Sequence, residues 1–353
     1  MNTVADFYTL DADAQALRMR RLAEVALARW GLAAREIALI KYRENAVFRV
    51  ALAEGGQVAL RIHRHGYHSD AELRSELQWL DALAADGIAV PRILPTLSGA
   101  LFGTVHVPAV PEPRQVDVFA WVSGRQLGSV EDGVDLDTDA IRSVYHTIGA
   151  LAARLHEQTA RWTLPEGFTR HAWDADGLAG PEPFWGKFWE LATLTDEERA
   201  LLVRARDAVH AGLTAYGRDP GNRERYGLIH ADLVAENVLV DDTDVRLIDF
   251  DDAGFGWHLF ELATALYFES DAPHFDAAFA AIIEGYRSVR ALPDAQIAHM
   301  PLFFAARSFT YLGWIHTRPE TETARTLGPM LTDMACRAAR RYLDASRAAG
   351  YRT

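Results

Sequence analysis

The sequence has a single cysteine, Cys336, so no disulfide can form within the chain. It also lacks an apolar run long enough to span a membrane and a basic segment followed by an apolar leader, so we expect a cytoplasmic protein with no membrane partner. Acidic residues outnumber basic ones, and the net charge of -13 argues against a nucleic-acid partner. These absences direct attention to soluble enzymes and binding proteins.

The composition is that of a globular protein, with 49% apolar and 24% charged residues. A chain of 353 residues exceeds the size at which a single hydrophobic core stops growing, which is about 250 to 300 residues. We therefore expect two compact lobes.

The first third of the chain reads mainly as β-structure. A helical pattern from Ala12 to Trp30 ends at Gly31, and a second helix from Ser69 to Asp86 begins with a capping box that pairs Ser69 with Glu72. Short β-rich runs make up the remainder and predict a mainly antiparallel sheet: EIALIKY, AVFRVAL, QVALRIHR, ALFGTVHV and VDVFAWV.

The rest of the chain has helical periodicity nearly throughout, which predicts an α+β protein with a larger, α-rich C-terminal lobe. We assign residues 1–118 to the first lobe, 119–124 to a hinge and 125–353 to the second lobe. The helices expected in the second lobe cover 140–156, 183–194, 196–216, 260–268, 272–287, 293–316 and 322–349.

The stretch HADLVAEN places Asp232 and Asn237 just before a predicted hairpin, VLV-DDTD-VRLIDF. Because a hairpin returns to its start, Asp249 at its exit is expected to lie beside Asn237. An amide oxygen and a carboxylate are hard ligands that suit Mg²⁺, while a further carboxylate can orient a hydroxyl nucleophile. The spacing therefore predicts a metal-assisted site for phosphoryl transfer.

HADLVAEN followed by LIDFDDAG resembles the motifs of the aminoglycoside phosphotransferase and choline kinase family, which includes type II homoserine kinases, hydroxylysine kinases and stress response kinase A. The resemblance extends from about residue 37 to about residue 320. It implies a bilobal protein-kinase-like fold and the use of Mg²⁺ and ATP, with Asp232 as the catalytic base and Asn237 and Asp249 as metal ligands. By the same resemblance, His230 and Glu261 support the catalytic loop.

The resemblance assigns the first lobe to the nucleotide. Arg61 stands where the family carries a lysine that holds the phosphates, and Glu76 is the expected partner on the helix, although Lys41 is an alternative cation. Because the family uses lysine here, we expect Arg61→Lys to retain much of the function. The remaining nucleotide-binding candidates are Glu44, Asn45, Phe119, Trp121 and Val122.

The acceptor is predicted to be a small amine-bearing hydroxyl compound: an amino alcohol, a hydroxy amino acid or an amino sugar. The motif carries Ala231 in place of the phosphate-sensing arginine of protein kinases, and the chain passes quickly from Asp249 into the next helix, which leaves little room for a peptide. The alternatives are a Ser/Thr protein kinase resembling stress response kinase A, and a pseudokinase-like nucleotide-binding module. The acceptor-binding candidates are Asp251, Asp252, Glu236, Arg307, Tyr311 and Trp314.

Overall fold

The computed structural model describes residues 4–43, 45–130, 132–241 and 244–348. The chain divides into two compact units, each described here by itself. Unit 1 takes the chain up to Ser123 together with Leu164–Thr169, and unit 2 holds Gly124–Thr163 and the chain from Arg170 onward. The assignment of 119–124 as a hinge stays a prediction.

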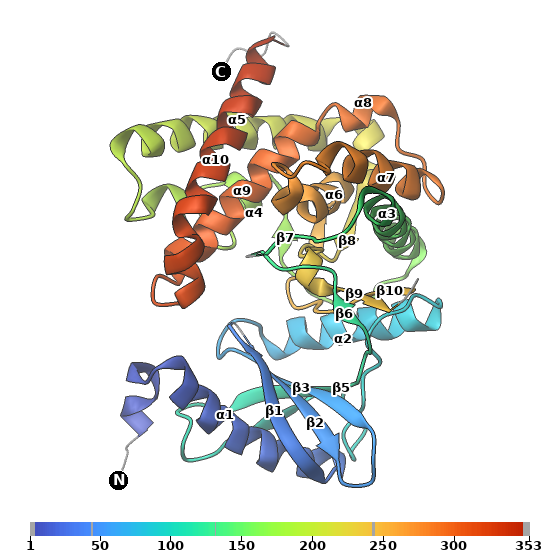
Figure 1. The fold of residues 1–353 in the computed structure, drawn as a ribbon, viewed down its shortest axis with the longest axis vertical. Coiled ribbons are helices and arrows are strands. Elements are labelled where there is room, and N and C mark those ends of the chain that lie inside the picture. Colours follow the sequence, from blue (N-terminus) through green and yellow to red (C-terminus); the bar gives the residue numbers. More distant parts are fainter. Residues whose placement is uncertain (1–3, 44, 131, 242–243, 349–353) are drawn as a thin grey trace. The chain divides into compact units, whose positions relative to one another are not determined.

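Unit 1 contains a five-stranded antiparallel sheet in the order β1-β2-β3-β5-β4 (Figure 1). Each of the β-rich runs contributes a strand, so the prediction of an antiparallel sheet is confirmed. The three central strands pair in register through Phe48, Leu60 and Val118. The strands are β1 (Ala34–Tyr42), β2 (Ala46–Leu52), β3 (Gln57–Ile62), β4 (Gly103–Val105) and β5 (Arg114–Ala120).

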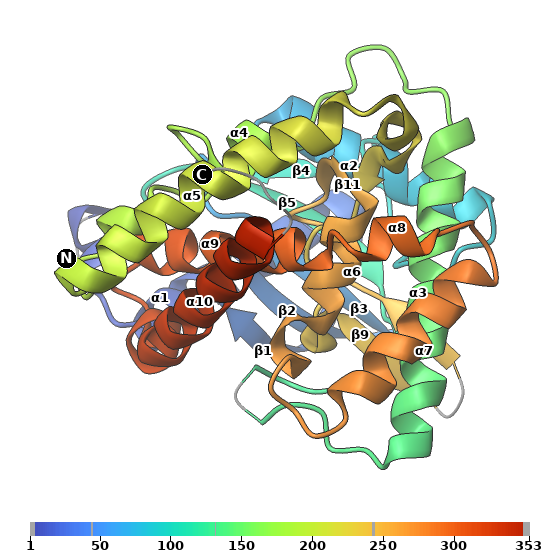
Figure 2. The ribbon, with the colours of Figure 1, turned by 90° about the horizontal axis from the view of Figure 1, so that it is seen from above.

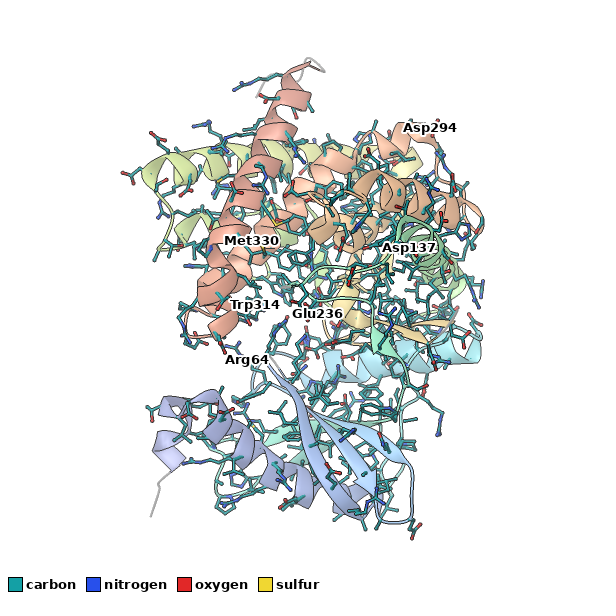
Figure 3. The ribbon with its side chains drawn as sticks, viewed as in Figure 1. Arg64, Asp137, Glu236, Asp294, Trp314 and Met330 are labelled. Atoms are coloured by element: carbon teal, nitrogen blue, oxygen red, sulfur yellow. The ribbon has the colours of Figure 1, made fainter. Side chains whose placement is uncertain are left out.

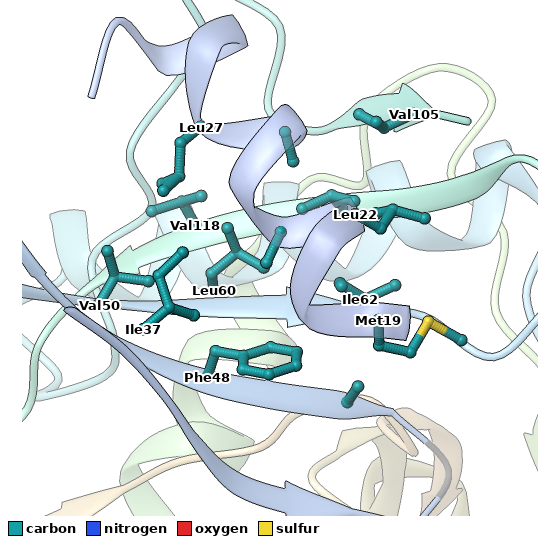
Figure 4. Close-up of a cluster of buried hydrophobic side chains, with 14 of the residues drawn as sticks. Met19, Leu22, Leu27, Ile37, Phe48, Val50, Leu60, Ile62, Val105 and Val118 are labelled. Atoms are coloured by element: carbon teal, nitrogen blue, oxygen red, sulfur yellow. The ribbon is translucent and has the colours of Figure 1, made fainter. Parts of the chain in front are cut away.

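One face of this sheet packs against α1 (Ala12–Ala26), which continues as a 3₁₀ turn, η2 (Leu27–Trp30), and stops at Gly31 in the left-handed conformation. Met19 and Leu22 of α1 point toward Phe48 and Leu60 of the sheet (Figure 4). Because side chains alternate along a strand, these apolar residues lie on one face, and Arg61 on β3 points to the other.

Helix α2 (Asp70–Ala85) meets the sheet on the side of Arg61, whose side chain donates to Glu76 of the helix. Ser69 accepts a hydrogen bond from the backbone N–H of Glu72, and the Glu72 side chain accepts from the backbone N–H of Ser69, so the predicted capping box is confirmed. The start of α2 is thereby fixed, and Glu76, 1% exposed, lies among its buried residues.

Unit 2 contains two small sheets, ordered β10-β9-β6 and β7-β11-β8. The predicted hairpin is confirmed, because β9 (Val238–Asp241) pairs antiparallel with β10 (Asp244–Leu247) from Asp241 opposite Asp244. In the second sheet, β8, which precedes the HADLVAEN motif, pairs antiparallel with β11, which follows Asp249. Its strands are β7 (Ala172–Trp173), β8 (Tyr226–Ile229) and β11 (Gly254–Trp257), and β6 (Arg125–Gln126) completes the first sheet.

Helices form the rest of unit 2, as predicted, with two corrections. The expected helix over 183–194 is wrong: after Pro183 the chain turns at Gly186, whose φ is +109°, and only η3 (Phe188–Glu190) follows. The pattern over 293–316 is divided into two helices. The helices are α3 (Thr138–Arg161), α4 (Ala175–Ala179), α5 (Asp196–Arg218), α6 (His258–Leu266), α7 (Phe275–Arg287), α8 (Asp294–Ile297), α9 (Met300–Thr317) and α10 (Glu322–Ala348), with η1 (Val4–Thr9) in unit 1 and η4 (Pro220–Arg225), η5 (Ala235–Asn237) and η6 (Tyr267–Glu269) in unit 2.

Helices α3 and α7 lie side by side in both ribbon views (Figures 1 and 2). Their backbones approach so closely that a Cβ at Gly149 would lie 2.1 Å from the carbonyl oxygen of Ile282, and a Cβ at Gly285 would lie 1.9 Å from that of His146. Every residue of α6 is buried. Because α6 contacts α3, α7 and α9, its Glu261 lies in the interior of unit 2.

Candidate active site

The motif that follows β8 is held by a buried carboxylate from α6. The two oxygens of Glu261 accept hydrogen bonds from the backbone N–H groups of His230, at 2.7 Å, and Ala231, at 2.8 Å. Burial by itself raises the pKa of Glu261, but hydrogen bonds and electrostatic interaction with His156 and His230 outweigh it and hold that pKa below its ordinary value. The loop is therefore fixed by an ionised carboxylate.

His230 ties the loop to the end of the hairpin. Its Nε2 lies 2.9 Å from the carbonyl oxygen of Ile248, and its Nδ1 accepts from the backbone N–H of Asp232 at 3.3 Å. A carbonyl can only accept and a backbone N–H can only donate, so the partners assign the ring proton to Nε2. In this tautomer both ring nitrogens are occupied by backbone groups, and the imidazole has a scaffolding role.

Two residues of the site have left-handed backbone. Among the described residues, Ala231 (φ 65°) and Asp249 (φ 63°) are the non-glycine residues with positive φ. For an L-residue this conformation costs about 1 to 2 kcal/mol, and such strain persists where surrounding contacts impose it. Both lie in the predicted motif, one next to Asp232 and the other at the hairpin exit.

Asp232, Asn237 and Asp249 converge around the hairpin. The Asn237 side-chain nitrogen donates to the backbone oxygen of Asp232 and to its Oδ2, both at 2.9 Å. The backbone N–H of Ile248 donates to the carbonyl oxygen of Asn237 at 3.0 Å, which brings the neighbouring Asp249 to the same end. With its nitrogen turned to Asp232, Asn237 offers its amide oxygen elsewhere. This oxygen and the Asp249 carboxylate are donors of the kind a hard divalent cation prefers.

Arg307 of α9 completes the surroundings of Asp232. Its Nη2 donates to Asp232 Oδ1 and to the Tyr311 hydroxyl, both at 2.7 Å, and its Nη1 donates to the carbonyl oxygen of Ala231 at 3.1 Å. The Asp232 carboxylate is thus bound on both oxygens, by Arg307 on one and Asn237 on the other. Its side chain is still 23% exposed, so a hydroxyl group can approach it.

The other acceptor candidates have mixed surroundings. Glu236 of η5, labelled in Figure 3, is 6% exposed, and its Oε1 accepts from the backbone N–H of Val130 at 3.3 Å. Burial raises the pKa of Tyr311 against the opposing charge of Arg307, and the carboxylates of Asp232 and Glu236 add to the rise. The charge of Glu236 therefore acts on the same tyrosine as the charge of Asp232.

Asp251 and Asp252 follow the hairpin. Asp251 is 4% exposed, and its carbonyl oxygen accepts from Arg170. The carbonyl oxygen of Asp252 accepts from the Trp173 indole N–H at 3.0 Å, and its side chain is half-buried. The segment is therefore held in place through the backbone carbonyl groups of Asp251 and Asp252.

The aromatic candidates lie on α9. Tyr311 packs at 5.1 Å from the Tyr267 ring, between ring centroids, and the Arg307 guanidinium lies 4.2 Å from the Tyr311 centroid. Trp314, labelled in Figure 3, is covered by the Arg318 guanidinium at 5.2 Å. Both rings are thus already in contact with an arginine of this chain.

In unit 1, Arg61 lies in a buried ionic network. Its Nη2 donates to Glu76 Oε1 at 2.7 Å, and its Nε and Nη2 donate to the two oxygens of Asp117 at 3.1 and 2.7 Å. His63 Nε2 lies 3.0 Å from the same Asp117. Burial raises the pKa of Asp117, but the charges of Arg61 and His63 outweigh it and the pKa is lowered. Arg61 therefore has two carboxylate partners, one of them bidentate.

The other nucleotide candidates lie around the same sheet. Asn45 is buried and its Oδ1 accepts from the backbone N–H of Arg64 at 3.1 Å, so it joins the turn between β1 and β2 to the segment that follows β3. Phe119 lies under the Arg61 guanidinium at 5.2 Å, and Trp121 is 39% exposed. Val122 is half-buried, Lys41 is half-buried on β1, and Glu44 lies outside the described residues.

A family model described as "Phosphotransferase enzyme family" matches residues 37–292. The chain belongs to this family. The fold is similar to that of the structure of a microcompartment-associated aminopropanol kinase, which is 35% identical over 92% of this chain and 98% of that one, with a TM-score of 0.79. It is also similar to amicoumacin kinase hAmiN in complex with AMP-PNP, Ca²⁺ and Ami (19% identity, 95% and 96% coverage, TM-score 0.72). A homoserine kinase of Allorhizobium ampelinum is 27% identical over 76% of each chain.

The phosphotransferase is therefore a kinase of the kind that acts on small hydroxyl substrates, and the predicted fold and family are confirmed. Among its described residues, no helix has the length and apolar character needed to cross a membrane. The roles of individual residues stay predictions, but their hydrogen bonds divide them into groups. Asp232, Asn237 and Arg307 are joined by hydrogen bonds, as are Arg61 and Glu76.

Two features of the phosphotransferase were missed in the sequence. Asp117 lies within an apolar strand and gave no sign of binding Arg61, although its place directly opposite Arg61 on the neighbouring strand would have paired them once the register was known. Arg307 was assigned to the acceptor, whereas its side chain donates hydrogen bonds to Ala231 and Asp232 of the HADLVAEN motif.

Proposed function

We propose that this phosphotransferase transfers the γ-phosphoryl group of ATP to the hydroxyl group of a small, amine-bearing alcohol. The acceptor oxygen forms a bond to the γ-phosphorus, the bond between that phosphorus and the β–γ bridging oxygen breaks, and the hydroxyl proton passes to Asp232. The products are a phosphate ester and ADP.

One observation supports this proposal above the others: the Asp232 carboxylate is held on both oxygens yet stays partly exposed. In phosphoryl transfer the protein forms few covalent bonds itself. Catalysis depends on positioning the reactants and on stabilising the charge of the phosphoryl group. A carboxylate fixed by Arg307 and Asn237 is suited to orient a hydroxyl and to take its proton.

Mg²⁺ is the proposed metal, held by the Asn237 amide oxygen and the Asp249 carboxylate. When bound, such an ion neutralises phosphate charge. A divalent cation is supported by the Ca²⁺ and AMP-PNP named with the amicoumacin kinase structure. In unit 1, we propose that the cation of Arg61, oriented by Glu76 and Asp117, serves the phosphates.

The amine-bearing acceptor is supported by the similarity to an aminopropanol kinase and by the buried carboxylate of Glu236. An ammonium group paired with an exposed carboxylate gains only about 0 to 1 kcal/mol, whereas the attraction to a carboxylate of low exposure is screened less by water. Because Glu236 is nearly buried and acts on Tyr311, it is the carboxylate best placed to select an amine.

The test compares 1-amino-2-propanol, ethanolamine and homoserine with their N-acetylated forms in an assay of ADP release that requires Mg²⁺. We expect kcat/KM for the free amine to exceed that of its N-acetylated form by at least about tenfold, or about 1.4 kcal/mol. Glu236→Gln, which can still accept from Val130, is expected to reduce this preference. Glu157→Gln serves as the matched carboxylate control, because Glu157 pairs with Arg290 and is not an acceptor-binding candidate.

The outcomes separate the candidate functions. Equal kcat/KM for the two forms would contradict an amine-bearing acceptor. Phosphorylation of protein substrates without turnover of small alcohols would favour a protein kinase. Binding of ATP without any turnover in the whole panel would favour a nucleotide-binding module.

A further inference from the structure

Arg307 is a charged side chain in an apolar interior. It lies on α9 and is 0% exposed. Its guanidinium carbon lies 4.2 Å from the ring centroid of Tyr311, 5.4 Å from that of Trp185 and 5.7 Å from that of Phe260. Because a buried cation is costly unless it is paired and hydrogen-bonded, this position calls for a specific reason.

The pairing partners of Arg307 belong to the catalytic loop. One nitrogen binds the carbonyl oxygen of Ala231, the residue with left-handed backbone, and the other binds Oδ1 of Asp232, the next residue. One rigid guanidinium therefore holds both the strained peptide and the carboxylate that follows it. The planar fork of arginine suits this double contact, which a lysine amine cannot reproduce in the same geometry.

The Tyr311 hydroxyl holds the guanidinium in turn. It lies one helical turn along α9 and accepts from the same Nη2 that binds Asp232. The Tyr311 ring is packed against Tyr267 and Phe268, with centroids 5.1 and 4.8 Å away. The direction of Arg307 is thereby determined by packing on α9.

We infer that Arg307 is a positioning residue for phosphoryl transfer. Its hydrogen bond to Oδ1 fixes the Asp232 carboxylate in the orientation that presents it to the acceptor hydroxyl. The inference rests on the proposed function, in which Asp232 is the base. It moves Arg307 from the acceptor-binding group, where the sequence suggested it, to the support of the catalytic loop.

The first test is kinetic and uses Arg307→Lys and Arg307→Gln. A base displaced by about 1 Å can lose about 10²-fold in rate, so we expect kcat of Arg307→Gln to fall by about that factor. Arg307→Lys keeps the charge next to Asp232, and its kcat is expected to be about tenfold higher than that of Arg307→Gln. The KM for ATP is expected to stay within about twofold in both variants, because the proposed nucleotide cation, Arg61, belongs to a separate network with Glu76 and Asp117. A raised KM for ATP with unchanged kcat would overturn the inference.

The second test is a double-mutant cycle with Asp232→Asn. If Arg307 acts through Asp232, Arg307→Lys in the Asp232→Asn background changes the residual kcat by less than about twofold. Effects that multiply would mean that Arg307 acts independently of Asp232 and would overturn the inference.

Controls separate this inference from the proposed function and from folding defects. Arg206→Lys changes an arginine that also lies over a tryptophan ring (Trp189, 4.5 Å) and pairs with a carboxylate (Asp207, 2.6 Å), and it is expected to leave kcat unchanged. Full activity of Asp232→Asn would refute the proposed function itself. Loss of activity in Asp232→Asn with wild-type kcat in Arg307→Lys would refute only the positioning role. If Arg307→Gln fails to fold, the charge-conserving Arg307→Lys carries the decision.

Discussion

Removing the Asp232 side chain is expected to destabilise the protein as well as inactivate it. In Asp232→Ala the buried Arg307 loses its carboxylate partner at 2.7 Å. Leaving one member of a buried ion pair unpaired costs about 3 to 5 kcal/mol. Because the Asp232 side chain is 23% exposed, water can replace part of the contact, and we expect a loss of about 2 to 3 kcal/mol.

Asp232→Asn is expected to cost less, because its amide oxygen can still accept from Arg307. A hydrogen bond to a charged group contributes about 1.5 to 3 kcal/mol, so the alanine variant should be less stable than the asparagine variant by about 1 to 2 kcal/mol. The matched control is Asp207→Ala, which removes the exposed partner of Arg206 and should cost at most about 1 kcal/mol.

Urea unfolding followed by tryptophan fluorescence measures this order, with the slope of each transition checked to be unchanged. Substitutions of catalytic residues often stabilise an enzyme, because active sites are strained. If Asp232→Ala were as stable as the wild type or more so, the claim that Asp232 is the counter-ion of a buried arginine would be refuted.

Three further predictions concern the metal, the nucleotide and pH. Asp249→Ala should abolish Mg²⁺-dependent ATP binding by calorimetry, and unchanged affinity would contradict its role as a ligand. Arg61→Lys should raise the KM for ATP by at least about tenfold, because one ammonium cannot bind both oxygens of Asp117 as the guanidinium does; full recovery would support the simpler exchange expected from the family. Burial lowers the pKa of His156 and of His258, so unfolding takes up protons below the unfolded value of about 6.5, and stability should decrease as pH falls from about 6.5; a flat profile of melting temperature from pH 7 to 5 would contradict this.

Local patterns in the sequence predicted local structure well. The turn-forming DDTD between two apolar runs gave the hairpin with Asp241 opposite Asp244, and Ser69 with Glu72 gave the start of α2. Both depend on contacts within a few residues. The prediction of a helix over 183–194 was wrong because it relied on apolar spacing alone, whereas the chain turns at Gly186, where φ is positive.

Long-range partners could not be predicted from spacing. Arg307 and Asp232 are 75 positions apart, and Arg61 and Asp117 are 56 positions apart. Nothing in the helical pattern around Arg307 distinguishes a side chain that faces a ligand from one that faces a loop of the same unit. The contact between Asp232 and Asn237 was predictable because the two residues are five positions apart, whereas the arginine that binds Asp232 is brought to it by packing.

The arginine at position 61 also determines how this kinase can be labelled. Reagents that attach to a nucleotide site by acylating an amine need an unprotonated nitrogen nucleophile, and a guanidinium stays protonated. The only lysines in the sequence are Lys41 and Lys187, and the latter pairs with Glu182 at 2.6 Å. An amine-directed ATP analogue would therefore leave the network of Arg61, Glu76 and Asp117 unmodified, so that labelling of this enzyme by such a reagent would depend on Lys41 of β1.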